Sequence, residues 1–165
     1  MDKIKFKIIN TNDDKLISLI AKWYKEEWNI DEENTIMKLD RITKSSNEFQ
    51  VMMFNNNVPI GTAGIYQSVG IHKHFENLLK YPNWLALVYI IQNERRKGYG
   101  EMMCKNIEEI AAEKNMKELH LFTDTAEKLY RRMNWIKLDT LKHLDRNLVI
   151  MKKLIIADMQ KVYEE

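Results

Sequence analysis

A stretch near the middle of the chain, NERRKGYGEMM, combines a basic cluster with two glycines. Arg95, Arg96 and Lys97 run directly into Gly98 and Gly100, and a helical pattern follows. The N-terminus of a helix presents unpaired backbone N–H groups and about half a positive charge. Glycines let a ligand approach the backbone closely because they carry no Cβ. The pattern therefore predicts a binding site for phosphate or pyrophosphate at this turn.

Two common phosphate motifs do not fit the stretch. The chain has no G-x-x-x-x-G-K-[ST], which argues against a nucleotide P-loop. It also lacks a complete G-x-G-x-x-G followed about 20 positions later by an acidic residue, which argues against a dinucleotide fold. The alternative to anion binding is a surface turn in which the glycines only form the corner.

Length and charge narrow the function classes. The chain has 165 residues, 45% of them hydrophobic and 30% charged, with a net charge of +2. These values are typical of one globular domain with a substantial core. A nucleic-acid-binding protein usually has a stronger basic footprint, so we expect no nucleic-acid partner. If the basic cluster did contact nucleic acid, binding would depend steeply on salt.

The single cysteine, Cys104, excludes an internal disulfide framework and a cysteine-based zinc site, and no metal site is predicted. Its place in a helical pattern favours a small buried hydrophobe. The first ten residues alternate charged with apolar residues, unlike a secretory signal. No segment approaches the about 18 apolar residues of a membrane span. We therefore expect a cytoplasmic protein without a membrane partner.

The N-terminal half predicts a strand, two helices and a hairpin. Residues 4–9 alternate as in a strand with one wet face, formed by the lysines, and one apolar face. Thr11 and Asp14 resemble a helix-start signature, and helices are predicted at 13–27 and 31–44. Strands at 49–54 and 59–66 flank NNNV, whose asparagines tolerate positive φ in a hairpin turn.

The C-terminal half predicts a βαβ unit and a closing hairpin. Residues 84–91, WLALVYII, form an apolar run that is typical of a strand buried on both faces. A helix at 99–114 and a strand at 118–123 follow, which makes the two strands parallel. Asn115 and Asn134 are predicted left-handed helix ends. The other predicted elements are a helix at 125–133, strands at 135–139 and 147–154, and a helical extension at 155–165.

Two stretches of the sequence resemble motifs of the GNAT superfamily of acetyl-CoA-dependent N-acetyltransferases. RRKGYG matches the family's R/Q-x-x-G-x-G/A motif, and TAEKLYRRMNW (125–135) resembles its A-x-x-L/F-Y-x-x-x-G-F/W block. The resemblance covers 1–154 and implies a single α/β domain of the α+β type. It implies a mixed sheet of six to seven strands with helices on both faces. The parallel pair at 84–91 and 118–123 is expected to splay around the cofactor.

Three positions depart from the family pattern. Gln92 stands where a proline is usual, so the start of the loop is expected to be less rigid. Asn134 replaces a glycine and can adopt the same left-handed conformation. Thr123 replaces a common asparagine after the strand at 118–123, which puts one cofactor contact in doubt.

The resemblance implies a division of labour around acetyl-CoA. Backbone amides of the basic turn would hold the pyrophosphate, and the exposed backbone of Val88, Tyr89 and Ile90 would pair with the pantetheine arm. An N–H near Val88 would polarise the thioester carbonyl. The residues implied in cofactor binding are Val88, Tyr89, Ile90, Arg95, Arg96, Lys97, Gly98, Tyr99, Gly100 and Thr123.

Tyr130 is the implied catalytic residue. A phenol is protonated at neutral pH and can donate to the departing thiolate. The alternative for Tyr130 is a half-buried aromatic on a short helix. The attacking amine must lose a proton, but WLALVYII contains no carboxylate, so we assign no general base.

Several residues are candidates for the acceptor side of the site. A base or acceptor contact could come from His72, His74, Glu76 or Asp124, or from a water chain. The long segment 67–83 carries both histidines, which would face the same way only in an extended loop; a solvent-exposed pair is favoured instead. Trp84 could line the acceptor pocket, although core packing is its default role.

We therefore predict an enzyme that transfers acetyl directly from acetyl-CoA to a primary amine in a ternary complex. The sequence does not identify the acceptor amine. It also leaves the oligomeric state open, and a homodimer is one of the alternatives. The missing base motivates one alternative, a non-catalytic module that binds or senses acyl-CoA.

Overall fold

The structure of the protein is a computed structural model, and the description covers residues 2–155. The predicted C-terminal helical extension lies outside these residues except for its first position. Seven strands form a mixed sheet in the order β1-β2-β3-β4-β5-β7-β6. The strands are β1 (Ile4–Ile8), β2 (Phe49–Asn55), β3 (Val58–Tyr66), β4 (Trp84–Ile90), β5 (Glu118–Thr123), β6 (Ile136–His143) and β7 (Arg146–Leu154).

The helices are α1 (Asp14–Trp28), α2 (Glu32–Thr43), α3 (Tyr99–Glu113) and α4 (Glu127–Arg132). Three short 3₁₀ turns complete the described elements: η1 (Gly70–Lys73), η2 (Glu76–Lys80) and η3 (Gln92–Glu94). None of the helices in residues 2–155 has the length and apolar character needed to cross a bilayer. The predicted α/β class and strand number are confirmed.

The chain divides into two compact units. The first contains Met1–Tyr66 and Ala86–Ile107, and the second contains Gln67–Leu85 and the chain from Glu108 onward. Each unit therefore uses two separate segments of sequence. The prediction of a single domain over 1–154 stays a prediction.

In the first unit, β1, β2 and β3 form an antiparallel meander. The turn between β2 and β3 holds Asn56 and Asn57 at φ values of 50° and 69°. Both are left-handed conformations that asparagine tolerates, so the predicted hairpin is confirmed. At the edge strand β1 the predicted apolar face is incomplete, because Ile8 is 45% exposed.

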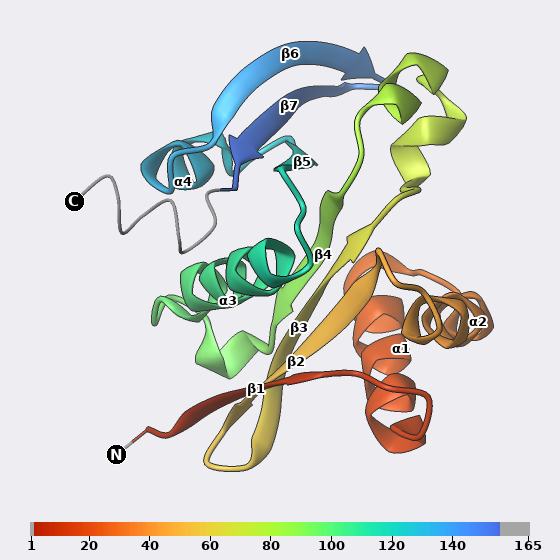
Figure 1. Cartoon of the computed structure of the whole chain (residues 1–165), viewed down its shortest axis with the longest axis vertical. Coiled ribbons are helices and arrows are strands. Elements are labelled where there is room, and N and C mark those ends of the chain that lie inside the picture. The colour runs from red at the N-terminus through yellow and green to blue at the C-terminus, as the bar shows by residue number, and fades with distance from the viewer. Residues whose placement is uncertain (1, 156–165) are drawn as a thin grey trace. The chain divides into compact units, whose positions relative to one another are not determined.

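Helices α1 and α2 lie side by side in the first unit (Figure 1). The apolar stripe of α1 buries Ile17, Ile20 and Tyr24, as the helical spacing predicts. The N-cap of α1 is Asp13, whose carboxylate accepts from the Asn10 backbone N–H at 2.9 Å. The predicted start signature, Thr11 with Asp14, was therefore wrong in detail, because the N-cap is Asp13. The Asp13 carboxylate is hydrogen-bonded to an amide of the preceding loop.

The second unit contains β5, β7 and β6, with β7 antiparallel to both neighbours. Figure 1 shows β6 and β7 as a long curved hairpin. Strand β6 extends to His143, beyond the predicted end at residue 139. Helix α4 is shorter than predicted, because the Thr123 hydroxyl accepts from the Ala126 N–H at 3.0 Å and forms a turn before the helix. Asn115 and Asn134 adopt φ values of 62° and 70°, as predicted.

Strands β4 and β5 are parallel, which confirms the predicted βαβ unit. Their registered pair is Trp84 with His120, and the His120 N–H donates to the Asn83 carbonyl at 2.9 Å. Trp84 is the first residue of β4. The registered pair thus lies at the beginning of β4, and the predicted splay stays a prediction.

Candidate functional site

The middle of β4 differs from a strand buried on both faces. Ala86, Leu87 and Val88 are partly exposed, whereas the residues on either side of them are buried. Leu87 has a φ of 53°, a left-handed conformation that is costly for a branched side chain inside a strand. The prediction of continuous burial was therefore wrong at these three residues. The positive φ of Leu87 marks a local backbone irregularity in this part of β4.

Strand β3 approaches the far end of β4 closely. A Cβ added at Gly61 would lie 2.8 Å from the Tyr89 carbonyl oxygen, so glycine is required there. The Ile91 N–H donates to the Ile60 carbonyl at 2.9 Å. These contacts fix β4 on both sides of Ile90, where the chain leaves the strand for the basic turn.

The basic turn contains two left-handed residues. Arg96 has a φ of 63° and Gly98 a φ of 84°, and α3 begins at Tyr99. Apart from its neighbours in the chain and the adjacent helix backbone, a Cβ added at Gly98 or at Gly100 would meet no described atom within 4 Å. The space in front of both glycines is therefore open, and the first N–H groups of α3 have no intrahelical carbonyl to bind. This geometry fits the predicted anion site, with the glycines keeping side chains out of it.

Two of the three cations in the turn are engaged within the protein. The Arg95 Nε donates to the Ile90 carbonyl at 2.7 Å, and its guanidinium pairs with Glu27 at 3.2 Å. Lys97 pairs with Glu94 at 3.2 Å. Arg96 has no ion pair within residues 2–155. The predicted roles thus separate, because Arg96 is the side chain most available to a ligand while Arg95 shapes the turn.

The Tyr99 side chain is buried in the protein and is not available to contact a ligand. Its hydroxyl donates to Asp2 Oδ2 at 2.7 Å, and only 6% of the residue is exposed. The hydrogen bond to Asp2, followed by burial, raises the pKa of Tyr99 to about 12. Of the predicted cofactor contacts at Tyr99, only the backbone N–H is compatible with this arrangement.

The Tyr89 and Ile90 side chains are also buried. The Tyr89 ring stacks on Trp23 at 5.2 Å between centroids, and the Arg95 guanidinium lies 5.4 Å from the same ring. Burial raises the pKa of Tyr89. Their side chains therefore belong to the core, and a ligand contact here would have to use the backbone, as predicted for the pantetheine arm.

In the second unit, Tyr130 lies on α4 and is partly exposed. Its ring packs edge-on against Trp135, with 5.9 Å between centroids. Thr123 ends β5, and its hydroxyl accepts the Ala126 N–H that begins the turn into α4. Thr123 therefore has a local structural role, which leaves its predicted cofactor contact to the backbone or to a second hydrogen bond.

The two loop histidines do not form a solvent-exposed pair. His72 is 6% exposed and packs edge-on against Trp84, whereas His74 is exposed and its ring lies 4.3 Å from that of His143. Their predicted pairing was wrong because the loop folds into the 3₁₀ turns η1 and η2 and is not extended. Burial lowers the pKa of His72, with a smaller opposing effect of the Leu78 backbone, which favours the neutral ring.

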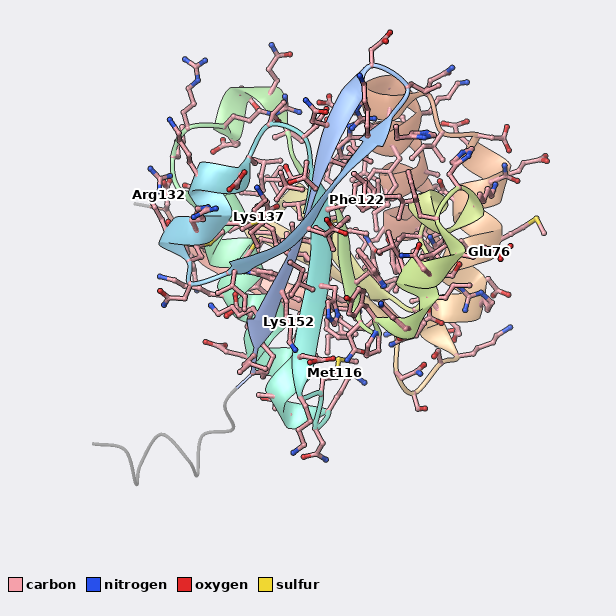
Figure 2. All side chains as sticks on the ribbon, turned by 90° about the horizontal axis from the view of Figure 1, so that it is seen from above. Glu76, Met116, Phe122, Arg132, Lys137 and Lys152 are labelled. Atoms are coloured by element: carbon pink, nitrogen blue, oxygen red, sulfur yellow. The ribbon has the colours of Figure 1, made fainter. Side chains whose placement is uncertain are left out.

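Trp84 is completely buried, and its indole N–H donates to the Tyr81 carbonyl at 2.7 Å. It is a core residue, which agrees with its expected default role and leaves no exposed surface for the alternative place in an acceptor pocket. Glu76 is exposed on η2 (Figure 2). Asp124 pairs with Arg146 at 2.8 Å. Of the five acceptor-side candidates, His74, Glu76 and Asp124 remain solvent-accessible.

Sequence reasoning missed the polar residues behind β4. The Tyr24 hydroxyl donates to the Leu87 carbonyl at 2.8 Å. Gln50 is completely buried and donates to Tyr24 at 3.0 Å. Tyr24 lies on an apolar helical stripe, and Gln50 lies inside an apolar strand. The only sequence signal for this network is therefore the glutamine, a polar residue at a position where an apolar one is expected.

Comparison with known proteins identifies the chain's relatives. The Acetyltransferase (GNAT) family model matches residues 14–135. A GNAT-family acetyltransferase from Streptococcus pneumoniae is 15% identical with a TM-score of 0.69, covering 93% of this chain and 100% of that one. No curated protein sequence matches.

Two further solved structures share the fold. An aminoglycoside 6'-N-acetyltransferase complexed with coenzyme A is 14% identical with a TM-score of 0.71, covering 92% of this chain and 97% of that one. The yncA protein of Salmonella typhimurium, solved with its cofactor acetyl-CoA, is 11% identical with a TM-score of 0.70, covering 93% and 94%. The family match over most of the chain agrees with the strand–turn–helix geometry, and this chain belongs to the GNAT family of acetyltransferases.

Proposed function

We propose that this protein transfers an acetyl group from acetyl-CoA to a primary amine. The observation that carries the proposal is the open turn at the start of α3, where Gly98 and Gly100 leave the backbone accessible. The N-acetyltransferase named among the structural relatives supports an amine acceptor, and two of those relatives contain coenzyme A or acetyl-CoA. A cytoplasmic location stays a prediction, and the oligomeric state stays open.

The proposed donor site lies in the first unit. The backbone N–H groups of residues 95–100 would bind the pyrophosphate, and the Arg96 guanidinium would add a charge. The exposed backbone of Val88–Ile90 would pair with the pantetheine arm, as an added strand does. These roles use the turn's left-handed residues and the partly exposed middle of β4.

The proposed chemistry is direct transfer. The amine nitrogen forms a bond to the acetyl carbonyl carbon while the carbon–sulfur bond breaks and its electron pair leaves on sulfur. The Val88 N–H would stabilise the negative charge that develops on the carbonyl oxygen. Tyr130 would give its phenolic proton to the leaving thiolate, and the phenolate would be reprotonated, directly or through water, by the proton that the amine nitrogen releases.

The acceptor amine loses one proton in this reaction. Strand β4 contains no carboxylate, and His72 is buried, so neither supplies an accessible base. We propose that the proton leaves through water or through one of His74, Glu76 and Asp124. A lysine-like amine is almost wholly protonated at neutral pH and must first lose its ammonium proton to attack, so the rate should rise with pH until the free amine predominates.

The test is incubation of the protein with acetyl-CoA and a library of amines, with mass detection of acetylated products and measurement of free CoA thiol. Equal amounts of product and thiol are expected for at least one amine. Binding of acetyl-CoA without any product across the library would favour the alternative, a non-catalytic acyl-CoA-binding module. Absence of both binding and product would contradict the proposal.

A further inference from the structure

The backbone conformation of Leu87 in β4 requires something to hold it. Leu87 adopts a left-handed φ of 53° in a strand, a conformation that is strained for a non-glycine residue. Such a conformation persists only where surrounding contacts enforce it. The contact that the structure provides on the Leu87 backbone is the hydrogen bond from Tyr24 on α1, with 2.8 Å between Oη and the carbonyl oxygen.

The direction of this hydrogen bond is fixed by a buried network in the first unit. The Gln50 side-chain amide has two N–H groups, and they donate to the Tyr24 hydroxyl at 3.0 Å and to Thr62 Oγ1 at 2.8 Å. The Thr62 hydroxyl in turn donates to the Val51 carbonyl at 2.7 Å. Since Tyr24 accepts from Gln50, its own proton is left for Leu87.

The network is completely desolvated, which makes it specific. Tyr24 is 1% exposed, and Gln50 and Thr62 are 0% exposed. The Tyr66 hydroxyl donates to the remaining acceptor, Gln50 Oε1. Burial raises the pKa of Tyr24, so the phenol stays protonated and remains a donor throughout the physiological range.

Holding the Leu87 carbonyl also orients the next N–H. The Leu87 carbonyl and the Val88 N–H belong to one planar trans peptide unit and point in opposite directions. A carbonyl held toward Tyr24 therefore turns the Val88 N–H away from α1. We propose that Tyr24 is a positioning residue that aims the Val88 N–H at the thioester carbonyl of the acyl donor, an inference that rests on the proposed function.

The matched pair for the test is Tyr24→Phe and Tyr66→Phe. Each variant removes one buried hydroxyl from the same network and keeps the ring, but the Tyr24 hydroxyl donates to a β4 carbonyl whereas the Tyr66 hydroxyl donates to Gln50. Steady-state kinetics, CoA affinity, and stability in urea should be measured for both. The backbone amide of Val88 should also be followed by NMR in the ligand-free proteins.

A positioning role predicts a selective defect in Tyr24→Phe. Its kcat should fall by about 10- to 100-fold, less than for complete loss of an oxyanion donor, while its CoA dissociation constant changes by less than about threefold. Its Val88 amide resonance should shift. Tyr66→Phe should lose stability but should show neither the fall in kcat nor the shift of the Val88 resonance, because the Tyr24–Leu87 hydrogen bond is retained.

Two outcomes would overturn the inference. Equal effects of both variants on kcat would assign Tyr24 only a packing role. An unchanged Val88 amide resonance in Tyr24→Phe would also assign Tyr24 only a packing role, and this readout does not depend on activity. Absence of turnover in the wild-type protein would instead contradict the proposed function. If Tyr24→Phe does not fold, the double variant Tyr24→Phe/Gln50→Leu should be compared with the single variant Gln50→Leu. This comparison isolates the same Tyr24 hydroxyl and leaves fewer buried polar groups unpaired.

Discussion

Arg95 Nε donates to the Ile90 carbonyl oxygen at 2.7 Å, which joins the first cation of the turn to the last residue of β4. The same guanidinium pairs with Glu27 on α1 and lies over the Tyr89 ring. A motif arginine that the sequence suggests for phosphate thus links three parts of the first unit. Its effect on a ligand is exerted through the shape of the turn.

Arg95→Ala and Arg96→Ala are therefore expected to differ. Arg95→Ala removes a charged hydrogen bond to a backbone carbonyl and should lower the free energy of unfolding by about 1–2 kcal/mol. Arg96→Ala removes an exposed side chain and should change stability by less than about 0.5 kcal/mol, with a modest loss of CoA affinity. Urea denaturation and calorimetric titration check both values, and equal stability losses would contradict the division of roles.

Acetyl-CoA should stabilise the folded protein. At about 100 times its dissociation constant, a ligand that binds only the folded state adds about 2.7 kcal/mol to the free energy of unfolding. Thermal unfolding with acetyl-CoA, NAD and ATP at equal concentrations measures the specificity of the effect. A shift only with acetyl-CoA is expected, whereas an equal response to all three would indicate nonspecific anion binding.

Tyr130→Phe should separate catalysis from packing. The variant keeps the ring that packs against Trp135 and removes only the hydroxyl. If the phenol protonates the leaving thiolate, kcat and kcat/KM should both fall by about 10²–10⁴-fold while CoA affinity stays nearly intact. Steady-state kinetics and CoA titration are the measurements. Full activity would mean that water or another group supplies the proton.

Lys38 on α2 should make stability depend on pH above neutrality. Burial, followed by Arg41, lowers the pKa of Lys38 to about 8, with Glu48 opposing the shift. Its Nζ lies 4.0 Å from the centroid of the Tyr66 ring. Between this value and the ordinary lysine pKa, the unfolded chain binds more protons than the folded one, so raising the pH favours folding.

Comparison of wild type with Lys38→Met isolates this titration from that of other groups. The stability of wild type relative to the variant should rise by about 1–2 kcal/mol between pH 7 and pH 10, a figure reduced for the partial exposure of the side chain. Urea denaturation at both pH values measures it. A difference that is constant or falls with pH would show that Lys38 stays charged in the folded protein.

Most of the fold is legible in the sequence because its local signals agree. The asparagines at the β2–β3 turn and after α3 and α4 adopt the left-handed φ that the residue type tolerates. The apolar spacing of α1 and α3 matches their buried faces. Shared periodicity and turn chemistry therefore placed the elements, with errors mainly at the ends of α4 and β6.

The remaining features depend on contacts between distant residues. Nothing local predicts that Tyr24 contacts Leu87, 63 positions later, or that Leu87 adopts a positive φ. The segment around His72 and His74 has no strong periodic signal, and its compact turns depend on tertiary packing such as that of His72 on Trp84. The position of the motif glycines was predictable, whereas the internal pairing of Arg95 and Lys97 was not.

The measurement that tests the account most directly is calorimetric titration of CoA into Gly100→Asp, with Gly70→Asp as the matched control. Apart from its neighbours in the chain and any adjacent helix backbone, a Cβ at either glycine would meet no described atom within 4 Å, and neither glycine has a positive φ, so both variants should fold. Aspartate at residue 100 places a carboxylate where the phosphate is proposed to bind. We predict at least about tenfold weaker CoA binding, or about 1.4 kcal/mol, for Gly100→Asp and unchanged binding for Gly70→Asp. Unchanged affinity in a folded Gly100→Asp would contradict the assignment of the turn to the acyl donor.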